Sequence, residues 1–233
     1  MKKALTYLCI LGAVPACIAF GAILWGNERY YLVSALALLL ACAPVFFRFE
    51  KGAHTAREAA VMGAVIAAAV ASRAAFFWLP QVKPIGAVAV ICAAAFGPEA
   101  GFLCGAASML LSNLMFGQGP WTPYQMFALG LSAFLCGLIL RRGLRTNRFA
   151  LALTGGLAVT LVYGLIADSC TVLLTVQEPV FSTVWPVYAA GLPFNLIFGG
   201  TTAVVLLTAG PGCVSALTRL RTKYGVFGGE ART

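Results

Sequence analysis

Apolar residues gather into eight long runs along the chain, separated by short polar stretches. About 20 consecutive apolar residues are needed for one helical crossing of a bilayer. The eight runs cover residues 4–25, 30–47, 59–78, 85–97, 100–116, 126–140, 149–176 and 187–209. This pattern predicts an all-α integral membrane protein that crosses the bilayer several times.

Two of the runs have unusual lengths. The run at 85–97 is too short for a comfortable crossing. We expect it to be tilted, extended into its flanks or buried by its neighbours. The run at 149–176 exceeds one crossing, and we expect part of it to bend or to lie in the membrane interface.

Composition strengthens the membrane interpretation. Of the 233 residues, 61% are hydrophobic and only 10% are charged, whereas a soluble domain carries about a quarter charged residues. The first run follows Lys2 and Lys3 as a signal peptide would. It is long enough to span, however, and a second run follows it at once. We therefore predict an uncleaved helix.

The distribution of basic residues predicts an orientation. The 16 Lys and Arg against 7 Asp and Glu would suggest nucleic-acid binding in a soluble protein. In a membrane protein, Lys and Arg mark cytoplasmic loops. Eight crossings from a cytoplasmic N-terminus leave only Arg29, Arg73 and Lys83 on the outer side. We therefore predict a multi-pass protein of the cell membrane with both termini cytoplasmic and no nucleic-acid partner.

Three predicted outer loops have a distinctive composition. Residues 78–84, 117–125 and 177–186 are rich in proline, aromatic residues and amides. An aromatic belt at the membrane interface would explain one or two tryptophans. Three such loops on one face favour a ligand-binding role, since proline stiffens the backbone and Trp or Tyr supplies apolar area with a polar group.

Motifs for catalysis and metal binding are missing. There is no P-loop, no G-x-S-x-G and no H-E-x-x-H. The only histidine, His54, falls in a predicted cytoplasmic loop, and none of the 8 cysteines forms a C-x-x-C pair. We predict no metal site, no cofactor, no disulfide framework and no enzymatic activity. Energy for any transport would come from an ion gradient or a partner.

Small residues recur at helical spacing in two places. Ala60, Ala64 and Ala68 lie four residues apart, and Gly97, Gly101 and Gly105 form a doubled G-x-x-x-G. Such spacing lets another helix approach closely. We expect the glycines to pack inside this chain. For the alanines, a partner subunit competes with internal packing.

Polar residues at predicted membrane depth are candidate functional groups. They are Arg73, Asn113, Asp168 and Asn195, and such residues are costly in a bilayer unless they serve a role. Arg73 either extends to the interface or contacts a ligand. Asp168 either pairs with Arg73, contacts a ligand or lies near water.

Residues from about 56 to 210 resemble the substrate-binding S component of an energy-coupling factor (ECF) transporter. The resemblance is carried by residues 57–61, the alanine stripe, residues 73–80, residues 96–102 and, most specifically, residues 117–126. The Gln-Gly-Pro-Trp-Thr-Pro string at 118–123 is similar to the cobalamin-type subgroup.

The resemblance implies an architecture and a set of partners. It implies a six-helix substrate-binding core at 56–212, preceded here by a two-helix extension at 1–55 and followed by a basic cytoplasmic tail at 213–233. A vitamin would be captured from outside, with cobalamin or a related corrinoid as the first candidate. Ala60, Ala64 and Ala68 would dock on a transmembrane T component, and two cytoplasmic ATPases would drive a toppling of the S component. The two added helices depart from the six-helix pattern.

The candidate substrate-binding residues combine polar groups with aromatic walls, as ligand pockets do. The polar candidates are Arg73, Gln81, Lys83, Asn113, Gln118, Gln125 and Asp168, and the aromatic candidates are Phe76, Phe77, Trp78, Trp121 and Tyr124. A stand-alone secondary carrier and an assembly subunit without a ligand are the alternatives.

Overall fold

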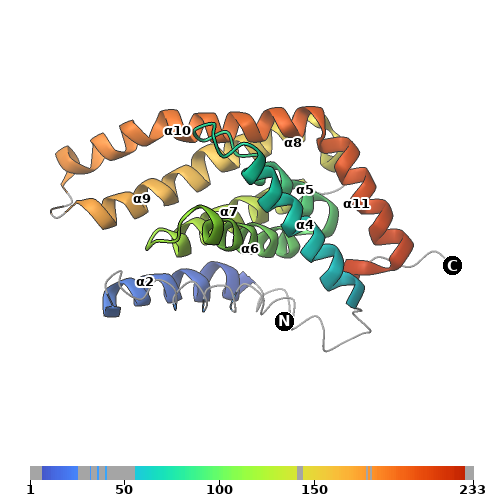
Figure 1. Ribbon diagram of the computed structural model, residues 1–233, viewed down its shortest axis with the longest axis horizontal. Helices are drawn as coiled ribbons and strands as arrows, with labels where there is room; N and C mark the ends of the chain where they lie inside the picture. The colour runs from blue at the N-terminus through green and yellow to red at the C-terminus, as the bar shows by residue number, and fades with distance from the viewer. Residues whose placement is uncertain are drawn as a thin grey trace.

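The computed structural model describes residues 7–25, 32, 36, 40, 56–140, 144–176, 178 and 180–228. All regular structure within these residues is helical, which confirms the all-α prediction (Figure 1). Most of the second predicted run, His54 and both chain termini lie outside the described residues.

Five helices of the described part are long and apolar enough to cross a membrane. They are α4 (Ala56–Ala75), α6 (Pro98–Phe116), α7 (Thr122–Ile139), the continuous helix Arg148–Thr175, and α10 (Phe181–Thr208). Shorter apolar helices are α5 (Ile85–Phe96) and the N-terminal pair η1 (Cys9–Ala13) and α2 (Val14–Trp25). The chain is therefore a multi-pass membrane protein.

The helices α6 and α7 form the centre of the bundle and are joined by a short turn (Figure 1). Glycines allow their close approach: a Cβ on Gly105 would lie 2.9 Å from the backbone of Gly130, and one on Gly137 would lie 2.7 Å from Pro98. Gly101 faces Ala93 of α5 in the same way. The predicted role of Gly101 and Gly105 in internal packing is thus confirmed.

Helix α5 is the short crossing expected from the sequence. It begins after Pro84, ends at Gly97 and has 12 residues, of which all but Val88 are buried. Gly97 takes a positive φ of 112° and turns the chain into α6. Burial by neighbouring helices, among them α6, α7 and α11, is therefore how the structure accommodates the short run.

The long run at 149–176 forms one helix that contains a π-helical segment. It consists of α8 (Arg148–Leu157), η3 (Ala158–Tyr163) and α9 (Gly164–Thr175), and the side chain of Asn147 caps its start. Its first half, which includes α8, packs most closely along α10 (Figure 1). A Cβ on Gly156 would lie 3.0 Å from Ala203, so glycine again permits the close approach.

The C-terminal residues fold back onto the core. Helix α11 (Gly210–Tyr224) and the turn η4 (Val226–Gly228) pack against α5 and the start of α4. The backbone N–H of Phe227 donates to Oε1 of buried Glu58, and the Phe227 ring stacks on Phe96 at 4.5 Å. The domain boundary expected at 212/213 therefore falls inside a helix.

The N-terminal helix lies against the central pair of helices (Figure 1). Ile10, Val14 and Ile18 are buried, and the Tyr7 ring packs edge-on against Phe134 of α7 at 5.4 Å. This helix is thus part of the hydrophobic core, although it precedes the expected six-helix core at 56–212.

Candidate functional site

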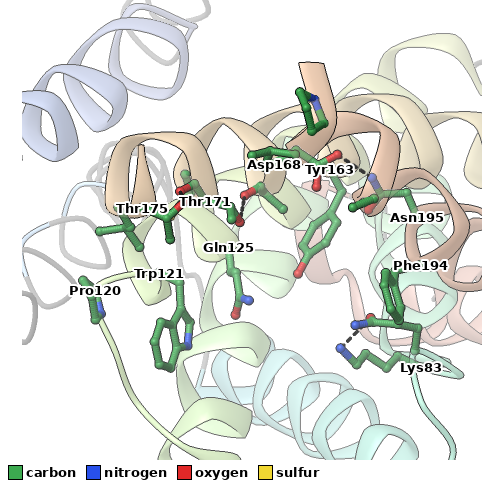
Figure 2. Close-up of a pocket in the computed structure, with 18 residues that line it drawn as sticks. Lys83, Pro120, Trp121, Gln125, Tyr163, Asp168, Thr171, Thr175, Phe194 and Asn195 are labelled. Carbon is green, nitrogen blue, oxygen red and sulfur yellow. Dashed lines mark hydrogen bonds between the residues drawn. The ribbon is translucent and has the colours of Figure 1, made fainter. Parts of the chain in front are cut away.

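A cavity of about 1020 Å³ lies at the end of the bundle that carries the α4–α5 and α6–α7 loops. Its walls come from the α4–α5 loop, the start of α7, and the facing sides of α9 and α10 (Figure 2). Its lining residues are Gln81, Lys83, Pro120, Trp121, Gln125, Tyr163, Ala167, Asp168, Cys170, Thr171, Leu174, Thr175, Pro186, Val187, Ala190, Gly191, Phe194 and Asn195. All three of the proline- and aromatic-rich regions contribute to it.

The structure divides the predicted substrate-binding residues into two groups. Gln81, Lys83, Trp121, Gln125 and Asp168 line the cavity. The remaining candidates do not line it: Arg73, Phe76, Phe77, Trp78, Asn113, Gln118 and Tyr124.

The residues outside the cavity lie in two kinds of place. Phe77 and Trp78 are 69% and 67% exposed at the end of α4, where an aromatic belt at the membrane interface accounts for them. Gln118 turns inward and donates from Nε2 to the carbonyl of Leu110, while its buried Oε1 has no partner.

Lys83 brings a cationic donor into the cavity. Its Nζ donates to Gln81 Oε1 at 2.8 Å and lies 6.0 Å from the centre of the Phe198 ring. Burial, together with the positive charge of Arg73, lowers the pKa of the Lys83 amine from 10.5 to about 8. Gln81 has a positive φ of 59°, which is uncommon for a residue with a side chain and is typical of functional loops.

Asp168 and Asn195 form a pair across the α9–α10 contact. Asn195 Nδ2 donates to Asp168 Oδ2 at 2.8 Å (Figure 2). Each side chain faces a glycine of the opposite helix: a Cβ on Gly191 would meet the Asp168 carboxylate, and one on Gly164 would meet Asn195. Asp168 therefore pairs with Asn195 and lines the cavity. Of the alternatives that the sequence left open, the pairing of Asp168 with Arg73 is not found, because Arg73 donates to Ser112 and Asn113.

Arg73 points toward α6. Its Nη1 donates to Ser112 Oγ at 2.5 Å and to Asn113 Oδ1 at 2.8 Å, and its guanidinium lies 5.4 Å from the centre of the Phe116 ring. Asn113 in turn donates from Nδ2 to Gln125 Oε1 at 2.9 Å. Arg73 is therefore linked to the cavity through other side chains and does not extend to the membrane interface.

An aromatic wall is built around Trp121. The backbone N–H of Thr122 donates to the Gly119 carbonyl at 2.9 Å, which closes a tight turn. A Cβ on Gly119 would overlap the Trp121 indole ring, so only glycine lets this ring lie over the turn. Phe194 of α10 lies at another wall of the cavity (Figure 2).

Sequence reasoning missed Tyr163. This residue ends the π-helical segment η3, is only 7% exposed, and reaches between Gln125 and Lys83 (Figure 2). In the sequence it lies in an apolar run and is typical of a core residue. The signal that could have found it is the spacing of Tyr163, Asp168, Thr171 and Thr175, which places polar groups on one face of that run.

The cavity has two chemically different sides. Lys83, Gln81 and Gln125 offer N–H donors, because the side-chain oxygens of both glutamines already accept hydrogen bonds. Asp168 offers a carboxylate on α9. Within the described residues, no group of three or more His, Cys, Asp or Glu could hold a metal ion. The arrangement suits a flat organic molecule with acceptors at one end and hydroxyl groups at the other.

Comparisons with known proteins give one match. Residues 55–210 match the model of the family described as ECF-type riboflavin transporter, S component. The search of curated proteins and the search of solved structures returned no match. The matched region begins next to α4 and ends at the junction of α10 and α11.

Proposed function

Since the chain belongs to the S-component family of ECF-type riboflavin transporters, we propose that it is the substrate-binding membrane subunit of a vitamin importer and that its vitamin is a flavin. The family match supports the S-component prediction and does not support the cobalamin-type subgroup. The substrate is therefore argued from the chemistry of the cavity.

The observation that carries the proposal is that one cavity with aromatic walls has N–H donors on one side, at Lys83 and Gln125, and the Asp168 carboxylate on the other. Riboflavin is a flat fused-ring system with carbonyl oxygens, joined to a polyhydroxylated chain. The ring carbonyls would accept from Lys83 and Gln125, the ring faces would contact Trp121 and Phe194, and chain hydroxyls would donate to Asp168. Few polar groups on apolar walls are the usual design of such a pocket.

The cavity is large enough for a flavin. The volume of about 1020 Å³ is at the upper end of pockets that enclose drug-sized ligands, roughly 300 to 1,000 Å³. A corrinoid with its nucleotide loop is far bulkier than a flavin and would need all of this space or more.

The test is a titration of the purified protein with riboflavin, followed by quenching of flavin fluorescence, with cyanocobalamin measured in parallel by equilibrium dialysis. We expect riboflavin to bind and cyanocobalamin not to bind. Asp168→Ala and Gln125→Leu should each weaken riboflavin binding by about tenfold or more. Absence of riboflavin binding would overturn the proposed substrate. Binding of cyanocobalamin would instead support a corrinoid as the substrate.

We further propose that uptake needs a T component and two cytoplasmic ATPases, as the family implies. Support comes from α4, where the exposed residues beyond Arg57 are all alanine or glycine, among them Ala60, Gly63, Ala64 and Ala68. A stand-alone secondary carrier is the alternative. Riboflavin uptake by this chain expressed without ATPase partners, and abolished by an uncoupler, would favour the carrier.

The proposed orientation places both termini in the cytoplasm, with the cavity facing out. It is supported by the basic loops at the ends of the chain. Cys213, the exposed cysteine of the described chain, lies at the start of α11 on the proposed inner side. A variant that keeps only Cys213 should react with a membrane-impermeant maleimide in inverted vesicles and not in intact cells; the reverse result would invert the orientation.

A further inference from the structure

A chain of hydrogen bonds runs from Arg73 on α4 through Asn113 on α6 to Gln125 at the cavity wall. We propose that Arg73 is a positioning residue for the ligand site: through Asn113 it fixes the side-chain amide of Gln125 so that its N–H groups face the ligand. The protein thereby selects a ligand that presents a hydrogen-bond acceptor at this wall. The inference rests on the proposed function, and it explains how the ligand site would select its ligand.

The first link is set by the chemistry of Arg73. A guanidinium has donors only and stays protonated in proteins. Its Nη1 lies 2.8 Å from Asn113 Oδ1 and 2.5 Å from Ser112 Oγ, next to the Phe116 ring. Asn113 must therefore turn its oxygen toward Arg73, because the opposite orientation would place N–H groups against N–H groups.

The second link follows from the burial of Asn113. Its side chain is 1% exposed, so a lost hydrogen bond could not be replaced by bulk water. With its oxygen held by Arg73, Nδ2 donates to Thr122 Oγ1 at 3.2 Å and to Gln125 Oε1 at 2.9 Å. Both amide hydrogens of Asn113 are used, and each requires an acceptor.

The third link sets the polarity of the cavity wall. Gln125 must turn its oxygen toward Asn113, and its Nε2 hydrogens remain for the cavity that Gln125 lines. Lys83, which also donates, lines the same cavity (Figure 2). A ligand carbonyl is therefore favoured at this wall, and a ligand amino group would meet two donors.

The test is Asn113→Asp, which keeps the size of the side chain and removes its donors. The new carboxylate can still accept from Arg73, but it forces Gln125 to donate toward it and to turn Oε1 into the cavity. Riboflavin affinity should fall by roughly 10- to 100-fold. In a Gln125→Leu background the same substitution should change affinity by less than about twofold, because the group that it reorients is gone.

A merely structural contact between α4, α6 and α7 would give a different result. Asn113→Asp would then weaken riboflavin binding by the same factor in the wild-type and Gln125→Leu backgrounds, and such additivity would overturn the proposal. Ser112→Ala is the matched control, because it removes another partner of Arg73 and leaves Asn113 intact; it should change affinity by less than about twofold. If Asn113→Asp does not fold, Arg73→Met should show the same dependence on Gln125 with a smaller loss.

A measurement without ligand separates this inference from the proposed function. Hydrogen exchange of the Gln125 side-chain amide, followed by NMR of the protein in nanodiscs, should be fast in the wild type, where the amide faces the cavity. It should slow at least about tenfold in Asn113→Asp, where the amide donates to a buried carboxylate. Equal exchange rates in the wild type and in Asn113→Asp would overturn the relay even if riboflavin binds. If the wild type fails to bind riboflavin but the exchange rates differ as expected, only the proposed substrate is overturned.

Discussion

At the scale of single residues, Lys83 is the most informative group. Its amine lies in the cavity beside Gln81, and burial with the nearby charge of Arg73 brings its pKa to about 8. A lysine with this pKa is a cationic donor at neutral pH and a neutral amine in mildly alkaline solution. Ligand binding through Lys83 should therefore depend on pH within an accessible range.

We predict that riboflavin affinity falls as pH rises from 7 to about 9.5. Because the pKa of Lys83 is lowered, the protonated amine that favours a ligand acceptor prevails below pH 8 and is lost above it. The loss should approach tenfold per pH unit at most, since one proton is coupled to binding. In Lys83→Arg, which stays cationic, the profile should be flat apart from the titration of riboflavin itself. If riboflavin affinity fell equally steeply with pH in the wild type and in Lys83→Arg, Lys83 would be excluded as the origin of the pH dependence.

A substitution at Gly191 tests whether the Asp168–Asn195 hydrogen bond matters for ligand binding. A methyl group added there would meet the Asp168 carboxylate, which has to move away from Asn195. We predict that Gly191→Ala weakens riboflavin binding about tenfold and destabilises the protein by about 1–3 kcal/mol. Gly200→Ala on the same helix is the control, because nothing lies within 4 Å of its added methyl. Equal effects of the two substitutions on affinity would contradict the importance of the pair.

At the scale of elements, α4 divides into two faces with different roles. Met62, Val65 and Ala69 are buried against the bundle, while Ala60, Ala64 and Ala68 are exposed. An exposed face of small residues allows close approach of another helix within a membrane. The same helix carries Arg73 near its C-terminal end, so the proposed relay and the proposed docking face share one element.

We predict that Ala64→Leu abolishes co-purification of the T component, because the larger side chain keeps the two backbones apart. Riboflavin affinity of the purified subunit should stay within about twofold, since Ala64 lies far from the cavity lining. Ala189→Leu, at an exposed alanine of α10, is the matched control and should leave co-purification unchanged. Retention of the T component by Ala64→Leu would rule out this face as the docking surface.

Elements were easier to predict than the site. The lengths of the apolar runs identified the crossings because membrane helices need a minimum number of apolar residues. The π-helical segment could not be predicted, because nothing in the residues 158–163 distinguishes it from ordinary helix. Arg73 and Asn113 were singled out as ligand contacts, but their direction depends on which helix packs beside them. Only the folded structure places α6 between Arg73 and the cavity.

At the scale of the whole molecule, α11 and η4 close the end of the bundle away from the cavity. Val226 and Phe227 are buried, and Arg221 donates to the carbonyl of Ala95 at 3.1 Å at the end of α5. The contact with Glu58 joins this segment to the beginning of α4. The start of the matched region is thereby held to a segment that follows the matched region in the chain.

We predict that Phe227→Ala destabilises the protein by about 3 kcal/mol, because it removes a buried ring that stacks on Phe96. For a chain of this size the melting temperature should fall by roughly 5–10 °C. Tyr224→Ala, at an exposed aromatic residue of the same segment, should change it by less than about 2 °C. Thermal unfolding of both variants in the same detergent checks this, and a similar effect of both would contradict a specific role for Phe227.

The shortness of α5 fixes how deep the ligand lies. Its 12 residues rise only about 18 Å, against a hydrocarbon core of about 30 Å. In the proposed orientation, with the end of α5 at the inner boundary, the loop before it would end about 12 Å below the outer boundary of the hydrocarbon core, where Lys83 lies 6.0 Å from the centre of the Phe198 ring. The proposed vitamin, held there, would have left bulk water and would lie at the level of the lipid tails. Binding alone would then cover part of the distance across the bilayer, before the proposed ATPases act.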